Sequence, residues 1–145
     1  MIKPEELRLG NIFHAEDDFL HMGCDVKILA ITELDVEWIS LGKSNVGYKQ
    51  RDNIIDLEPI VINEEWLLKA GFESWRRDGN YWEFWRAKNN FYIEQWIKDE
   101  QVDGWEEKGC LYWGEGYVKI KYFHQLQNLY YALTGRELVE EAKKK

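Results

Sequence analysis

The densest group of residues that could bind a ligand lies between positions 79 and 122. The chain has eight tryptophans, and five of them fall in this stretch, at positions 82, 85, 96, 105 and 113, interspersed with tyrosine, arginine and lysine. Aromatic rings stack on planar groups such as nucleic-acid bases, at about 1–3 kcal/mol per ring, and Arg and Lys pair with phosphate. The residue types therefore predict a site for a ring-bearing anion. The alternative is that the rings fill a core.

Candidates for catalysis or metal binding are weaker. Residues that could ligate a metal are His14, Asp17, Asp18, His21 and Cys24, but their spacing matches no standard zinc pattern. The segment Glu106-Glu107-Lys108 contains the E-x-K fragment of some nuclease sites, without a convincing upstream acid, and His124 has no nucleophile near it in the sequence. GxSxG, P-loop and GxGxxG motifs are absent. We therefore expect no catalytic residue, no metal and no cofactor.

Composition and charge restrict the class of protein. Of 145 residues, 45% are hydrophobic and 32% are charged, which is typical of a globular chain. The net charge is 19 − 27 = −8, and residues 1–62 carry −6 of it while residues 63–145 carry −2. Such a field repels a duplex phosphate backbone, so duplex DNA is not an expected partner.

Location follows from what the sequence lacks. It has no secretion signal at its start and no run of about 18 apolar residues that would span a membrane. Cys24 and Cys110 are far apart and form no CxxC pair. A cytoplasmic chain with two reduced thiols is the simplest interpretation, and a single disulfide is the alternative.

The first half of the chain predicts short strands. The candidate strands are residues 11–14, 25–33, 35–42 and 54–62. Val36, Trp38 and Ser40 alternate with other residues in the period-two pattern of a strand, and Pro59 favours an edge or a bulge. Residues 42–53 are polar and indicate a loop. Several short strands in about 60 residues predict a small barrel or a curled sheet.

The second half predicts a helix, four strands and a helix. Asn63 is a good N-cap and Gly71 a good C-terminal stop for a short helix. Asp78-Gly79 predicts a hairpin. The candidate strands are residues 80–86, 91–98, 110–113 and 117–122, and the arm before the hairpin adds residues 73–77. Apolar residues at helical spacing from Phe123 to Leu133 predict a last helix that ends at Thr134-Gly135.

The sequence therefore predicts an α+β protein. Residues 1–62 form a small β-barrel-like module, and residues 63–145 form an α-β-β-β-β-α module with an antiparallel sheet. The two parts are either separate modules or one continuous domain.

Alternation along the later strands assigns side chains to two faces. Phe91, Ile93 and Ile97 share one face, which we expect to meet the helices, and Tyr92 and Trp96 share the other. The segment 80–86 is aromatic on both faces. The predicted ligand contacts are Trp85, Arg86, Tyr92, Trp96, Tyr117, Lys119 and Lys121, with Arg76 and Arg77 at the rim. The alternative is that this face packs on the N-terminal module and is closed.

Three segments resemble a known family. They are ELRLGN at 6–11, EPIVINEEWLLKAGF at 58–72 and KYFHQLQNLYYALTGREL at 121–138. They are similar to a family of small uncharacterised proteins found in phages, prophages and mobile elements of bacteria, although the tryptophan-rich middle departs from it. The resemblance implies an accessory protein of a mobile genome, and it transfers no chemistry.

The first functional hypothesis is a non-enzymatic phage or mobile-element protein in the host cytoplasm. It would bind a small anionic, nucleotide-like ligand and sequester that ligand from host defence. The first alternative is an acidic inhibitor or nucleic-acid mimic that blocks a host protein, through Asp17, Asp18, Asp25, Glu33, Asp35 and Glu37. A second alternative is a structural or assembly component, which would form a stable homo-oligomer.

Overall fold

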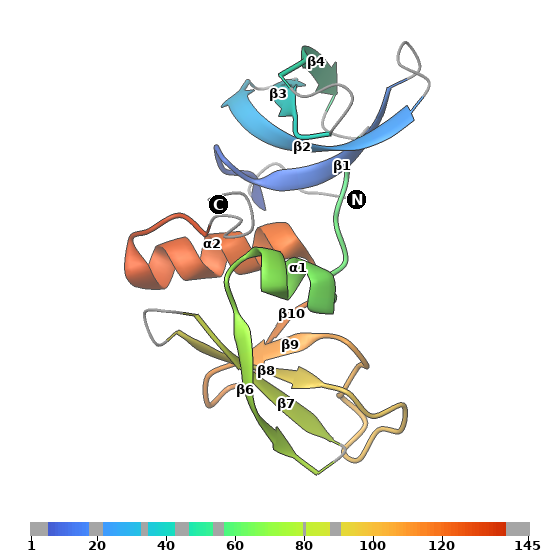
Figure 1. The fold of residues 1–145 in the computed structure, drawn as a ribbon, viewed down its shortest axis with the longest axis vertical. Helices are drawn as coiled ribbons and strands as arrows, with labels where there is room; N and C mark the ends of the chain where they lie inside the picture. Colours follow the sequence, from blue (N-terminus) through green and yellow to red (C-terminus); the bar gives the residue numbers. More distant parts are fainter. Residues whose placement is uncertain are drawn as a thin grey trace. The chain divides into compact units, whose positions relative to one another are not determined.

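The computed structural model describes residues 6–17, 22–32, 35–42, 47–53, 57–79, 81–87 and 91–138. The fold in this part is α+β, as predicted, with two antiparallel five-stranded sheets and two helices (Figure 1). The chain divides into two compact units, Met1–Ile60 with Tyr122–Glu137, and Val61–Lys121 with Leu138–Lys145. Neither described helix is long and apolar enough to cross a membrane.

The first unit contains a curled, half-barrel sheet. Its strands are β1 (Ile12–Asp17), β2 (Met22–Ile31), β3 (Asp35–Ser40), β4 (Lys49–Asn53) and β5 (Leu57–Glu58), in the order β4-β3-β2-β1-β5. In β3, Val36, Trp38 and Ser40 are buried and the residues between them are not, which confirms the predicted alternation. Phe13, Val26 and Trp38 are at the centre of the core of this sheet.

Strand β4 corrects the prediction of a loop at residues 42–53. Lys49–Asn53 is polar throughout, yet it pairs with β3 in antiparallel register. Its inward residues are held by side-chain bonds, because the indole Nε1 of Trp38 donates to Asp52 Oδ2 at 2.7 Å and the Gln50 amide donates to Asp52 Oδ1 at 3.2 Å. A polar edge strand also discourages pairing with another sheet.

Helix α2 (Phe123–Thr134) completes the first unit. It ends where predicted, at Gly135, whose φ of +71° gives the left-handed conformation that glycine adopts most easily. The helix packs on β1, with the rings of His124 and Phe13 4.8 Å apart. This helix, which the sequence predicts to cover the second sheet, belongs to the unit that contains the first sheet.

The second unit begins with α1 (Glu64–Lys69). Asn63 caps this helix as predicted, since its side chain accepts a hydrogen bond from the Trp66 amide at 2.9 Å. The sheet that follows contains β6 (Glu73–Asp78), β7 (Trp82–Arg86), β8 (Tyr92–Trp96), β9 (Leu111–Trp113) and β10 (Val118–Ile120), each paired with the next. The arm before the Asp78-Gly79 turn is thus a full strand, which gives five strands rather than four.

Candidate functional site

The register of the second sheet separates a core face from an aromatic face. Ile93 pairs with Trp85, and Gln95 pairs with Leu111. These four side chains are buried, and we call their side of the sheet the core face. The alternate residues of β8, such as Tyr92 and Glu94, point to the opposite side of the sheet, which we call the aromatic face.

Trp85, which is one of the predicted ligand contacts, therefore lies on the core face and not on the aromatic face. Its side chain is 1% exposed. The indole Nε1 donates to Gln95 Oε1 at 3.1 Å, and the Gln95 amide donates to the Gly109 carbonyl at 3.1 Å. The ring is a core residue in this structure.

Trp96 lies on the aromatic face, but the chain covers it. Residues 97–110 return over this end of the sheet, so that the Trp96 amide donates to the Cys110 carbonyl at 3.1 Å and the Gly109 amide donates to the Trp96 carbonyl at 2.8 Å. Cys110, Tyr112 and Trp82 cluster with the Trp96 ring, which is 2% exposed. Its indole N–H has no hydrogen-bond partner among the described residues.

The other end of the aromatic face is open. The Trp75 ring centroid lies 6.0 Å from that of Phe84 and 5.7 Å from that of Tyr92. The Arg76 guanidinium lies over Phe84 at 4.8 Å and the Arg86 guanidinium lies 5.9 Å from the Trp75 centroid. We call these five residues the stacking surface. Its three rings line a cavity of about 530 Å³.

A bulge in β6 creates this arrangement. The register shifts between Ser74 and Arg76, so Trp75 is an extra residue in the strand. In regular alternation Trp75 and Arg76 would point to opposite faces, but both contact the Phe84 ring. The bulge therefore brings an indole and a guanidinium to the same face.

Glu94 and Glu115 are the acidic residues that line this cavity, and Glu94 is the one beside Arg76. Burial raises the pKa of its carboxyl above the ordinary value of 4.5, and the Arg76 guanidinium offsets part of that effect. An anion bound beside Arg76 would meet this carboxylate as a competitor.

The predicted cations Lys119 and Lys121 are paired with one carboxylate. Their ammonium groups lie 2.6 Å and 3.0 Å from the two oxygens of Glu107. Hydrogen bonds from Lys119, Lys121 and Cys110 lower the pKa of Glu107 to about 2. Burial and the Glu107 carboxylate raise the pKa of the Cys110 thiol to about 11. This thiol is therefore protonated at neutral pH and is a poor nucleophile.

The remaining predicted contacts are divided. Arg77 pairs across the strands with Glu83, so it lies on the face opposite Arg76, and its Nε is 3.3 Å from Glu83 Oε1. Tyr117 is 47% exposed and lines both the cavity of the stacking surface and a second cavity beside it. Of the nine predicted residues, the stacking surface contains Arg76, Arg86 and Tyr92.

The fold of the 97–110 loop depends on a buried carboxylate. The Asp103 amide donates to both oxygens of Glu106, and the Gly104 amide donates to Oε1, all at 3.0 Å. Burial raises the pKa of this carboxyl, but the backbone hydrogen bonds outweigh that effect, so the pKa lies below 4.5. Glu106 thus has a structural role, since its carboxylate holds the backbone of this loop.

We expect Glu106→Gln to lower the melting temperature by several degrees at pH 7, because an amide NH₂ cannot accept from these backbone donors. The folded state binds the Glu106 proton less tightly than the unfolded state. The stabilisation by the Glu106 carboxylate is therefore present above the pKa of the unfolded state, and it is lost as the pH falls through the pKa of the folded state. Thermal unfolding from pH 7 to pH 3 should show the difference between the two proteins shrinking in acid. A constant difference would contradict this role, and Glu100→Gln, in the same loop and exposed, is the control.

The metal candidates and the acidic candidates lie partly outside the described residues. His21, Asp18 and Glu33 are not described, nor is the side chain of Asp17. His14 Nδ1 is 3.5 Å from Asp25 Oδ1, and Cys24 is buried, as is Cys110, both as free thiols. Within the described chain no three His, Cys, Asp or Glu side chains gather as metal ligands would.

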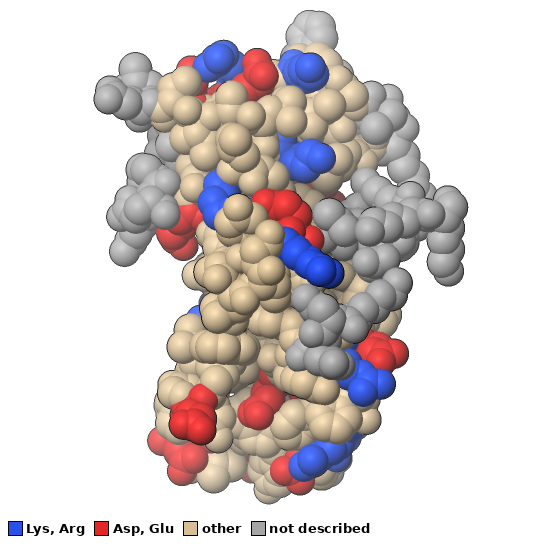
Figure 2. Space-filling view, turned by 90° about the vertical axis from the view of Figure 1, so that its left-hand side faces the viewer, with Lys and Arg blue, Asp and Glu red and all other residues tan. Residues whose placement is uncertain are grey.

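The acidic surface is partly neutralised where it is described. Asp35 is paired with Arg51 at 2.8 Å and accepts from the Thr32 hydroxyl at 2.8 Å. Glu37 lies opposite Arg51 in the sheet register. Figure 2 shows Asp and Glu interspersed with Lys and Arg on the face in view. A continuous acidic patch is not visible there.

Trp75 and Phe84 are the functional candidates that sequence reasoning omitted. Phe84 shares a strand face with Arg86 by simple alternation, so the period-two pattern could have found it. Trp75 could not have been found in this way, because its orientation depends on the bulge.

Comparison of the chain with protein-family models, with curated protein sequences and with solved structures found no significant match. The resemblance to small phage and mobile-element proteins therefore stays a prediction, and function has to be inferred from the stacking surface.

Proposed function

We propose that this protein is a non-enzymatic binding protein for a small anionic, ring-bearing ligand of the nucleotide class. The observation that carries the proposal is the stacking surface. Trp75 and Tyr92 are 42% and 47% exposed, in contact with each other, and two guanidinium groups lie within 6 Å of the same set of rings.

The two chemical parts of a nucleotide match the two parts of this surface. A base can stack on an exposed indole or phenol ring, and its phosphate can accept from a guanidinium beside that ring. Arg86 is held by Glu73, whose Oε1 accepts from its Nε at 2.7 Å, so its side chain is already positioned. Arg76 lies close enough to the partly buried Glu94 to offset part of the effect of burial on that carboxyl.

The resemblance to proteins of phages and mobile elements suggests what such binding is for. In the cytoplasm of a bacterial host, a phage or mobile-element protein that binds a nucleotide signal would withdraw it from host defence. This part of the proposal depends on the family resemblance alone.

Titration calorimetry with mononucleotides, cyclic mono- and dinucleotides and a short single-stranded oligonucleotide tests the proposal. We expect at least one of these ligands to bind. Trp75→Ala should weaken that binding about tenfold or more, since one stacked ring is lost. Arg76→Gln should weaken it and make it less sensitive to salt. Glu94→Gln should strengthen it, because a carboxylate beside the anion is removed.

Arg77→Gln is the matched control, one residue further along the same strand but on the other face. It should leave binding unchanged. The proposal fails if no ligand of the panel binds, or if Arg77→Gln weakens binding as much as Arg76→Gln does.

A further inference from the structure

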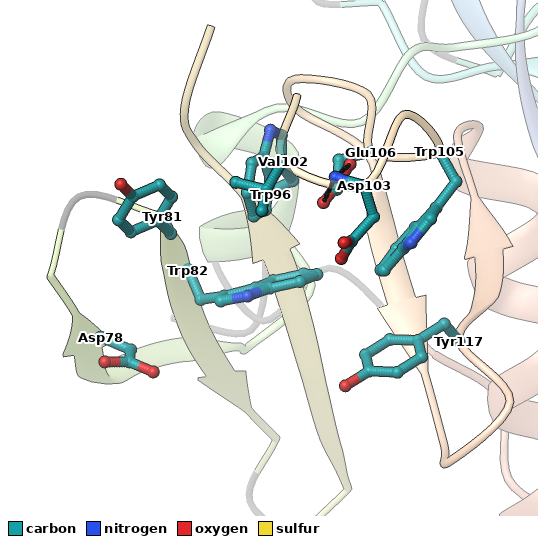
Figure 3. A pocket seen from close by; sticks show the side chains of 9 residues that line it. All are labelled: Asp78, Tyr81, Trp82, Trp96, Val102, Asp103, Trp105, Glu106 and Tyr117. Atoms are coloured by element: carbon teal, nitrogen blue, oxygen red, sulfur yellow. Dashed lines mark hydrogen bonds between the residues drawn. The ribbon is translucent and has the colours of Figure 1, made fainter. Parts of the chain in front are cut away.

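The second cavity on the aromatic face differs in charge from the stacking surface. It has a volume of about 370 Å³, and its lining residues are Asp78, Tyr81, Trp82, Trp96, Val102, Asp103, Trp105, Glu106 and Tyr117 (Figure 3). The lining thus combines five aromatic side chains with three carboxylic acids and contains no lysine or arginine. Its chemistry fits a cation.

The rings of this cavity leave part of their faces open. Trp105 and Tyr117 are 41% and 47% exposed. Their centroids are 5.0 Å apart, and both lie near Trp82, at 6.3 Å and 6.1 Å. These distances leave no space for a guest between two rings, so a ligand would rest against the ring faces that line the cavity.

The position of Tyr117 requires an unfavourable backbone conformation. Its φ is +50°, and it is the one non-glycine residue with positive φ in the described chain. A bulky side chain rarely adopts this conformation, because its Cβ crowds the backbone. The turn nevertheless holds its ring nearly parallel to Trp82, at an interplanar angle of 26°.

Two of the three carboxylates are free to meet a ligand. Glu106 is occupied by backbone amides. Asp78 and Asp103 are exposed, and neither side chain has an ion pair or a hydrogen bond within the described chain. In the view of Figure 3 the Asp103 carboxylate points toward the rings of Trp82 and Trp105, and Asp78 lies beyond the opposite edge of Trp82.

We propose that this cavity binds an alkylated ammonium ion of the choline type. The negative faces of indole and phenol rings attract a cation, and an alkylated ammonium loses less hydration on contact with them than a primary one. The carboxylates of Asp78 and Asp103 supply the opposite charge. Lys98 illustrates the contact, since its ammonium already lies 5.1 Å from the Tyr81 ring centroid.

Choline and tetramethylammonium are the probes, followed by NMR through the indole N–H signals of Trp82 and Trp105. Both should shift these signals in a saturable way. The uncharged analogue 3,3-dimethylbutan-1-ol has nearly the shape of choline, and it should bind about tenfold more weakly or not at all. Asp103→Asn and Asp78→Asn should each weaken choline binding several-fold, whereas Glu100→Gln should not. Glu100 is an exposed acid of the same loop that does not line the cavity.

The inference is overturned if neither cation gives saturable shifts, or if the uncharged analogue binds as well as choline. It is also overturned if Glu100→Gln weakens choline binding as much as Asp103→Asn, because net charge alone would then explain the effect. The two Asp→Asn changes affect exposed side chains, so thermal unfolding should show intact folds. Trp75→Ala should not change choline binding, which separates this site from the stacking surface.

Discussion

Trp85→Ala is expected to lower the free energy of unfolding by about 3–5 kcal/mol, the usual cost of removing a buried tryptophan ring. The ring is 1% exposed on the core face of the second sheet. Its removal also leaves Gln95 Oε1 without the indole donor that it accepts from at 3.1 Å. Since proteins of this size are stable by about 5–15 kcal/mol, the loss is a large fraction of the total. Urea unfolding followed by circular dichroism measures it.

Trp75→Ala is the matched control, because Trp75 is in the adjacent strand and 42% exposed. It should cost well under half as much. The two variants together distinguish the two roles of tryptophan in this sheet, core packing and ligand contact. Trp75→Ala should affect ligand binding more than stability, and Trp85→Ala the reverse. Equal stability losses would contradict the assignment of Trp85 to the core.

Much of the local structure can be predicted from the sequence. The alternation of Val36 and Trp38 predicted β3, Asn63 predicted the start of α1, and Gly135 predicted the end of α2, and each is confirmed. These signals depend on neighbours within a few residues, so they act wherever the segment lies in the fold. The α+β class follows from their order along the chain.

What the sequence did not predict depends on distant residues. Strand β4 looks like a polar loop until β3 supplies hydrogen-bond partners for its backbone. Alternation in β8 places Trp96 on the face that is predicted to be exposed, but the 97–110 loop covers it. Nothing in the strand itself indicates that loop. Period-two alternation assigns a face, whereas exposure depends on what packs there.

The same reason explains why the sequence did not predict which charged side chains of the candidate site stay unpaired. Lys119 and Lys121 fall on the predicted face, but Glu107 from a loop more than ten residues earlier pairs with both. Arg76 and Trp75 share a face only because of the bulge in β6. The sequence thus identified the residue types of a ligand site, and the pairing of strands and loops selected which of them stay available.

Gln127→Leu is expected to destabilise the first unit by several kcal/mol although it keeps the side chain's size. Gln127 is 1% exposed on α2. Its Oε1 accepts from the Ile12 amide at 2.8 Å, and its Nε2 donates to the Gly10 carbonyl at 3.1 Å. A leucine would fill the space but leave both backbone groups unpaired, at about 1–3 kcal/mol each. Urea unfolding should show a loss of that order.

Amide hydrogen exchange makes this prediction specific to one bond. The Ile12 amide depends on Gln127, so its exchange should become much faster in the variant. The Ile28 amide is the comparison, because it donates at 2.9 Å to the carbonyl of Asn11, the residue next to Ile12, and does not depend on Gln127. Its protection should fall only as far as global stability falls. Ala132→Leu adds the same side chain at an exposed position of α2 and should change stability by less than about 0.5 kcal/mol. If Ile12 and Ile28 lose protection equally, the glutamine acts through packing alone and not as the hydrogen-bonded link between α2 and β1.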